Sequence, residues 1–90
     1  MPKIRVKLFA NFREFTHTKE LELEGETVRE ILDSLCNRFA GLEELVFKNG
    51  TVRPYINIFI NGNNINESGG LEQELAPDDE LAIFPPVSGG

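Results

Sequence analysis

Residues 27–35, TVREILDSL, carry the clearest structural signature in this chain. Thr27 followed by Glu30 forms a capping box, in which the Thr27 side chain accepts from the third amide of the helix and Glu30 reaches back to the cap. Apolar side chains then recur at helical spacing, at Val28, Ile31, Leu32, Leu35 and Phe39. Gly41 stands where a glycine commonly ends a helix. The pattern predicts a helix over residues 27–40 with one apolar face.

Two alternating runs precede this helix. Residues 4–9 and 20–24 both place an apolar side chain at every second position, which is typical of half-buried strands. The two runs predict a hairpin. Residues 11–18 between them read as a loop, and Phe12 and Phe15 suggest that this loop folds back onto the core.

The second half of the chain predicts further strands. Residues 42–46 allow one short helical turn, and Asn49-Gly50 marks its exit. Residues 55–60, YINIFI, have the composition of a strong strand. The two-residue turn signal Asn61-Gly62 follows this strand. The remaining segments are a returning edge at 63–66, a loop at 67–73, a turn at 77–79 and a last strand at 80–84.

The order of these elements predicts an α+β domain over residues 1–84. A single amphipathic helix covers one face of a mixed sheet of about five strands. The first and last strands both have to contact the helix, which places them side by side and parallel. This arrangement is the ubiquitin-like β-grasp fold. Residues 85–90 form an extended tail beyond the domain.

The sheet face opposite the helix is expected to carry aromatic side chains. If the aliphatic residues of the strands point to the helix, alternation places Phe9, Phe59 and Phe84 on the other side. Exposed apolar patches mark association sites, so these residues are candidates for binding a partner. Two alternatives stay open: Phe12, Phe15 or the tail covers the patch, or the register differs by one residue.

Composition limits the classes of function. The net charge of −6 argues against nucleic acid as a partner, since that recognition depends on clustered Lys and Arg. Cys36 is the only cysteine, so no internal disulfide is expected and a reducing compartment fits. No segment has the apolar length of a signal peptide or a membrane span. We therefore expect a soluble, cytoplasmic protein that does not bind membranes.

Groups suited to catalysis are few. His17 falls in a loop and is interpreted as solvated, whereas Cys36 on the helix is interpreted as a half-buried structural thiol. Glu20, Glu22 and Glu24 form a solvated strand face, because carboxylates that keep their water stay ionised. No Cys/His cluster has metal-ligand spacing, and no glycine-rich loop ends in Lys-Ser or Lys-Thr. We expect a chain that is not an enzyme by itself and binds neither metal nor cofactor.

The tail has a composition suited to presenting a carboxylate. Pro85 and Pro86 lack an amide hydrogen, so they stop sheet pairing and hold the chain extended. Val87 and Ser88 follow, and Gly89-Gly90 ends the sequence. Glycine lacks Cβ and passes through a channel that rejects larger residues. We therefore expect residues 85–90 to form a stiff, extended segment that presents the Gly90 carboxylate to a partner.

Residues 82–90, AIFPPVSGG, resemble the C-terminus of MoaD-type proteins, the small subunit of molybdopterin synthase. They are equally similar to the C-terminus of the small archaeal modifier proteins, which are ubiquitin-like. Residues 6–14 and 58–62 also fit these groups, so the resemblance covers nearly the whole chain. Thiamine-pathway carriers of the ThiS type share the diglycine, but they are usually shorter and lack the double proline.

The resemblance implies a chemistry for Gly90. An activating enzyme of the MoeB type, which is related to ubiquitin-activating enzymes, would use ATP and Mg²⁺ to adenylate its carboxylate. Sulfur delivery would then give a thiocarboxylate for a MoaE-like large subunit of molybdopterin synthase. Attack by a lysine of a target protein would instead give an isopeptide bond. A third possibility is a non-covalent β-grasp interaction module whose C-terminus is incidental.

Overall fold

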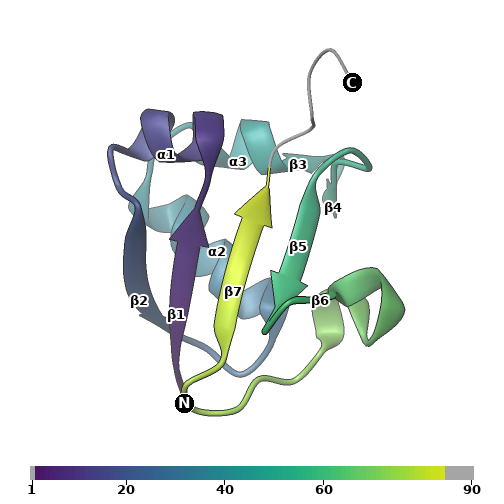
Figure 1. The fold of residues 1–90 in the computed structure, drawn as a ribbon. Coiled ribbons are helices and arrows are strands. Elements are labelled where there is room, and N and C mark those ends of the chain that lie inside the picture. The colour runs from purple at the N-terminus through teal and green to yellow at the C-terminus, as the bar shows by residue number, and fades with distance from the viewer. Residues whose placement is uncertain (1, 85–90) are drawn as a thin grey trace.

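The computed structural model describes residues 2–84; residue 1 and residues 85–90 lie outside the described part. Five strands form the main sheet in the order β2-β1-β7-β5-β6 (Figure 1). Their bounds are β1 Lys3–Leu8, β2 Glu20–Glu24, β5 Asn57–Ile60, β6 Asn63–Asn64 and β7 Glu80–Phe84. The other elements are α1 Ala10–Thr16, α2 Val28–Arg38, α3 Leu42–Val46, β3 Phe47–Lys48, β4 Thr51–Val52, and the 3-10 helices η1 Ile65–Glu67 and η2 Gly70–Glu72.

The first and last described strands lie side by side at the centre of the sheet. β1 and β7 pair in parallel, with Val6 opposite Leu81, whereas β1 pairs antiparallel with β2 and β7 pairs antiparallel with β5. The predicted mixed sheet, its central parallel pair and the α+β ubiquitin-like β-grasp fold are confirmed.

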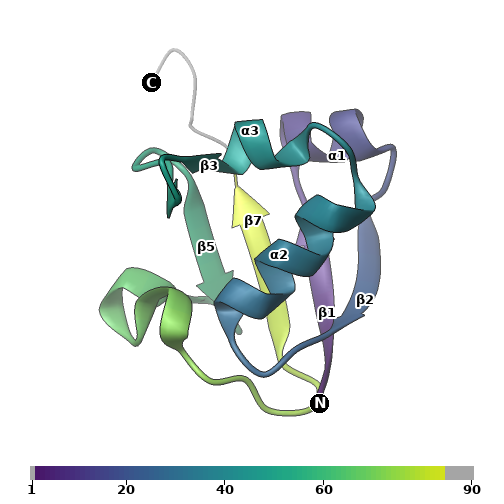
Figure 2. The same cartoon turned by 180° about the vertical axis from the view of Figure 1, so that it is seen from behind.

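The core lies between the sheet and α2, which crosses one face of the sheet (Figure 2). Val28, Ile31, Leu32 and Leu35 of α2 are fully buried against strand residues that alternate along each strand. The strand residues predicted to face the helix are all buried, namely Ile4, Val6, Leu8, Ile56, Ile58, Ile60, Leu81 and Ile83. Period-two alternation in the strands and helical spacing in α2 therefore meet in one apolar layer.

The start of α2 follows the predicted capping box in part. The Thr27 side chain accepts a hydrogen bond from the Glu30 amide at 3.3 Å, as expected. The Glu30 carboxylate accepts from the amide of Glu26 at 2.9 Å rather than from that of Thr27, so the reach-back extends one residue further. At the other end, α2 stops before Phe39, and Gly41 adopts a left-handed conformation (φ 88°) that begins α3.

The loop predicted over residues 11–18 is wrong, because residues 10–16 form α1. Phe12 is 1% exposed and belongs to the core. The Thr16 hydroxyl donates to the Phe12 carbonyl at 2.9 Å, and His17 ends the helix in a left-handed conformation. The segment is too short and too polar for helical periodicity to show. Burial of Phe12 stabilises a helix that its sequence alone does not predict.

Two Asn-Gly pairs make tight turns. Asn49 and Gly50 both have positive φ and form the turn of a hairpin between β3 and β4. The sequence predicted only that the helical turn ends here and did not predict the hairpin. Asn61 and Gly62 join β5 to β6 in the same way, as predicted.

The strand predicted over 55–60 begins only at Asn57. The predicted edge at 63–66 ends at Asn64 and continues as η1, and the predicted loop at 67–73 contains η2.

The described residues include no helix that is both long enough and apolar enough to cross a membrane.

Candidate functional site: an aromatic face beside the last strand

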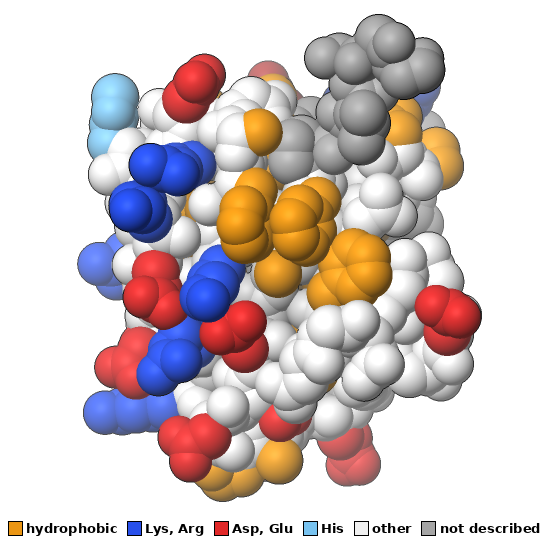
Figure 3. All heavy atoms as spheres, in the orientation of Figure 1, with side chains coloured by type: hydrophobic (Ala, Val, Ile, Leu, Met, Phe, Trp, Pro, Cys, Tyr) orange, Lys and Arg blue, Asp and Glu red, His pale blue; other side chains and the backbone are white. Residues whose placement is uncertain are grey.

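Phe9, Phe59 and Phe84, hereafter the phenylalanine face, lie together on the sheet surface opposite α2. The rings of Phe9 and Phe84 stack with their centroids 4.4 Å apart and their planes 11° apart. Phe59 meets Phe84 edge-on, with centroids 5.4 Å apart and planes at 89°. Figure 3 shows an apolar patch at this position on the surface. All three side chains are only half-buried.

Strand register brings these three residues together. Leu8 lies opposite Ile83 in the parallel pair β1–β7, so Phe9 follows at the level of Phe84. In the antiparallel pair β5–β7, Asn57 lies opposite Phe84 and Phe59 opposite Ala82. The ring of Phe59 therefore reaches that of Phe84 diagonally across the two strands. The predicted grouping and register are therefore confirmed, and binding of a partner by this face stays a prediction.

Two of the candidates for covering the phenylalanine face, Phe12 and Phe15, lie elsewhere, and the third, the tail, falls outside the described residues. Phe12 is buried in the core, and the ring of Phe15 lies beside Gly41, where an added Cβ would come within 3.1 Å of it. Neither side chain is on the open surface of the sheet.

A strip of ion pairs borders the phenylalanine face on the same sheet surface. Glu80 contacts both Lys7 (3.3 Å) and Arg5 (3.8 Å), and Arg5 also contacts Glu20 (3.3 Å). Figure 3 shows these alternating charges next to the apolar patch. Exposed pairs of this kind contribute little to stability, so their effect is to give the patch a polar boundary. This strip was not predicted from the sequence; its signal was opposite charge on neighbouring strands, directly opposite for Arg5 and Glu80 and diagonal for the other two pairs.

Cys36 is half-buried on α2, as predicted. Burial, and then the nearby carboxylates of Glu43 and Asp33, raise the pKa of the Cys36 thiol from 9.0 to about 11. A thiol with a raised pKa is a poor nucleophile at neutral pH, because the thiolate is the reactive form. This agrees with a structural role. His17 is exposed at the end of α1, and Glu20, Glu22 and Glu24 are exposed along β2.

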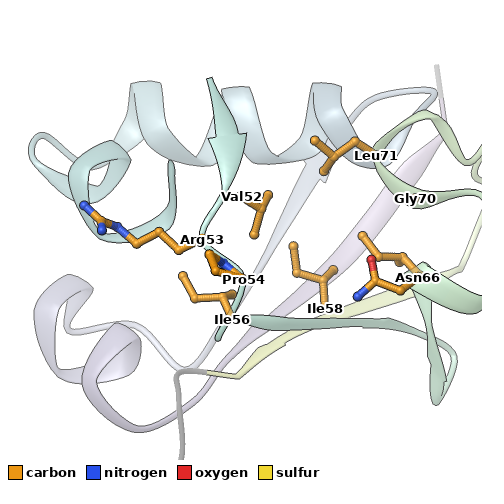
Figure 4. Close-up of a pocket in the computed structure, with 9 residues that line it drawn as sticks. Val52, Arg53, Pro54, Ile56, Ile58, Asn66, Gly70 and Leu71 are labelled. Carbon is orange, nitrogen blue, oxygen red and sulfur yellow. The ribbon is translucent and has the colours of Figure 1, made fainter. Parts of the chain in front are cut away.

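A small cavity lies on the other side of the sheet, between β5 and the 3-10 segments (Figure 4). It has a volume of about 110 Å³ and is lined largely by aliphatic side chains, among them Val52, Ile56, Ile58 and Leu71. Pockets for small molecules typically measure about 300–1,000 Å³. The cavity is therefore better described as a gap in packing than as a binding site.

Among residues 2–84, no three or more His, Cys, Asp or Glu side chains are grouped so as to hold a metal ion. The predicted tail residues Pro85, Pro86, Val87, Ser88, Gly89 and Gly90 lie outside the described residues. The functions predicted for them stay predictions. The structure describes the platform that precedes them: Phe84 ends a central strand whose Leu81 and Ile83 are fully buried.

A β-grasp domain whose last strand leads from an aromatic face to a diglycine defines the class of ubiquitin-like carriers and modifiers. Comparison with known families agrees with this class: the profile of the ThiS family matches residues 6–90. The chain belongs to the ThiS family.

Individual relatives extend this assignment. The solution structure of small archaeal modifier protein 1 from Methanosarcina acetivorans superimposes with a TM-score of 0.92 at 45% identity, covering 100% of this chain and 98% of the other. Small archaeal modifier protein 1 from Haloferax volcanii is 40% identical, with 93% of this chain and 97% of the relative covered. The molybdopterin synthase sulfur carrier subunit of Arabidopsis thaliana is 36% identical, with 98% and 83% covered. The chain is thus a homologue of both archaeal modifiers and MoaD-type sulfur carriers.

Proposed function

We propose that this chain is a ubiquitin-like sulfur carrier and protein modifier whose reactive group is the carboxylate of Gly90. The observation that carries the proposal is the position of Phe84. It ends the central strand of the sheet, completes the phenylalanine face, and immediately precedes the segment Pro85-Pro86-Val87-Ser88-Gly89-Gly90. A partner that docks on this face has the start of the tail within its interface.

The first step is activation of the carboxylate. An α-carboxyl group has a pKa of about 3.5 and is ionised at neutral pH, where it is a poor acyl donor. A carboxylate oxygen attacks the α-phosphorus of ATP, and pyrophosphate leaves, so that Gly90 becomes an acyl adenylate. A MoeB-like activating enzyme supplies ATP, Mg²⁺ and the cationic groups that offset the repulsion between two anions.

The adenylate then has two fates. Hydrosulfide attacks the acyl carbon, AMP leaves and a proton goes to solvent, which yields a thiocarboxylate for a MoaE-like large subunit of molybdopterin synthase. Alternatively, the neutral amine of a lysine attacks the same carbon, AMP leaves and a proton is lost, which yields an isopeptide bond to a target protein. The relatives named as sulfur carrier and as modifiers support both fates for one tail.

The phenylalanine face is the proposed docking surface for the activating enzyme. Aromatic side chains bury a large area with few rotatable bonds and are common anchors at interfaces. The three rings fix one another through stacked and edge-on contacts, so little side-chain freedom is lost on binding. We place this reaction in the cytoplasm, where the lone Cys36 remains a thiol.

One experiment tests the proposal directly. The full chain is incubated with a MoeB-like activating enzyme, ATP, Mg²⁺ and a sulfide source, and its intact mass is measured. We expect the mass to rise by one exchange of oxygen for sulfur, with AMP formed in equal amount. Fragment masses should place the sulfur on Gly90.

The modifier fate has its own readout. Conjugates of higher mass should form in cells that express the chain and should disappear when Gly89 and Gly90 are deleted. If the chain is instead a non-covalent interaction module, the deletion should leave both partner binding and biological activity unchanged, and no acyl adenylate should form.

A further inference from the structure

The outer edge of β2 carries backbone amides and carbonyls that do not hydrogen-bond to β1. Among the strands of residues 2–84, β2 stands at one end of the sheet order and pairs with β1 alone. The Leu8 amide donates to the Lys19 carbonyl (2.9 Å), and the Gly25 amide donates to the Pro2 carbonyl (3.2 Å). These two bonds fix the ladder, since hydrogen-bonded residues alternate along an antiparallel pair. Glu20, Glu22 and Glu24 therefore point their amides and carbonyls outward.

The side chains of the same three residues form one exposed acidic row. Register places them opposite cations of β1: Glu20 opposite Lys7, Glu22 opposite Arg5, and Glu24 opposite Lys3. Arg5 forms its ion pairs with Glu20 and Glu80, and Lys7 forms its ion pair with Glu80. Within residues 2–84, Glu22 and Glu24 consequently have no ion-pair partner. Their charge is available on the outer side.

We propose that this edge binds an extended, basic segment of a partner protein as an added strand. The segment carries Lys or Arg at alternate positions, which lie opposite Glu20, Glu22 and Glu24, and apolar residues between them. The apolar residues contact the other side of the strand, where Leu21 and Leu23 are half-buried. β1 itself, with the sequence KIRVK at residues 3–7, is an example of a strand that matches β2 in this way.

A second copy of this chain does not fit the same edge. Residues directly opposite each other in paired strands have side chains on the same face. Pairing of β2 with β2 therefore sets acidic rows against each other on one sheet face, and like charges in such pairs are destabilising. The acidic row disfavours pairing of β2 with a second β2 and favours a basic strand.

The proposed strand site is independent of the function proposed for Gly90. The sheet order places β1 between β2 and β7, so the outer edge of β2 lies about 10 Å from β7 at the usual spacing of strands. Figure 1 shows β2 at the opposite side of the sheet from β5 and β6. The chain is thus able to hold a basic segment of one protein while its phenylalanine face contacts another.

The test uses the full chain and an acetylated, amidated peptide of sequence KIRVK, followed by NMR titration. We expect the largest shifts at the amides of Glu20, Glu22 and Glu24, together with slower exchange of these amide hydrogens. A peptide N-methylated at the residues that pair with β2 is the backbone control and should lose binding. Equal binding of the N-methylated peptide overturns the proposal, because it means that no strand is added.

Charge variants separate specific docking from general attraction to an acidic protein. Glu22→Lys should lower the affinity for the peptide by about tenfold, since it turns an attractive cross-strand pair into a repulsive one. Glu67→Lys makes the same charge change in η1, beyond the other edge of the sheet, and should change affinity less than about twofold. Equal loss in both variants, or peptide shifts centred on the phenylalanine face, overturns the proposal. Absence of peptide binding also overturns the proposal, and would mean that the glutamates serve to prevent other chains from pairing with this edge.

Discussion

The ring of Phe9 stacks on the ring of Phe84, with centroids 4.4 Å apart, although Phe9 follows β1 near one end of the described chain and Phe84 ends β7 at the other. The contact exists because β1 and β7 are parallel neighbours, so that both strands end at the same edge of the sheet. Each ring is thereby held in place by the other while one side of the pair remains exposed. Residue 84 is also the last residue before the proposed reactive tail.

Substitution of Phe84 by Ala should weaken docking to the activating enzyme by about 1–3 kcal/mol, because it removes the central ring of the phenylalanine face. Phe59→Ala should have a smaller effect of the same sign. The measurement is the dissociation constant by calorimetry. Tyr55→Ala is the matched control, since Tyr55 is 48% exposed but takes no part in the ring contacts. Wild-type affinity in both Phe variants would show that the partner uses another surface.

Deletion of Gly89 and Gly90 should abolish adenylation and change the free energy of unfolding by less than about 0.5 kcal/mol, because the reactive carboxylate is removed and terminal residues contribute little packing. Gly89→Val should also impair adenylation, because a channel shaped for glycine rejects a branched side chain. Pyrophosphate release measures the reaction, and urea denaturation measures stability. Normal turnover of the Val variant would contradict the channel, and lower stability with full activity would contradict the separation of tail and domain.

Phe12→Ala should destabilise the domain by about 3–5 kcal/mol, since Phe12 is a fully packed core residue at 1% exposure. Phe15→Ala, in the same helix, should cost considerably less, because Phe15 is 39% exposed. Chemical denaturation of the two variants gives the comparison. Similar losses in both would mean that α1 packs on the core with a different face.

The Cys36 thiol should titrate near pH 11, and its alkylation by iodoacetamide at pH 8 should be about a hundredfold slower than that of the unfolded chain, because a pKa raised by about two units lowers the thiolate fraction by that factor. The folded state holds the thiol proton more tightly than the unfolded state. The resulting stability is therefore complete below pH 9 and declines as the pH rises from 9 to 11. Cys36→Ala should lack this part of the pH dependence. A pH dependence of the alkylation rate with its midpoint near pH 9 would contradict the raised pKa of the Cys36 thiol.

Sequence patterns were sufficient for the elements that bury a regular apolar face. The capping residue Thr27 and the spacing of Val28, Ile31 and Leu35 predicted α2, and alternation predicted β1 and β2. Local patterns failed at α1, β3 and β4, which contain seven, two and two residues. Residues 10–16 contain too few apolar residues to show a helix. α1 forms where the core buries Phe12, and β3 and β4 form on either side of the Asn49-Gly50 turn.

The sequence by itself determined the class of fold, the buried side of each long strand and the diglycine that identifies Gly90 as the proposed acyl group. These features depend on residue type and spacing along the chain, and both can be read locally. Only the tertiary structure decided that Phe9 stacks on Phe84, that Arg5 and Lys7 share Glu80, and that β2 lies at the edge of the sheet with the backbone groups of its glutamates pointing outward. These relationships join residues from different strands, and their distances exist only once pairing fixes the register.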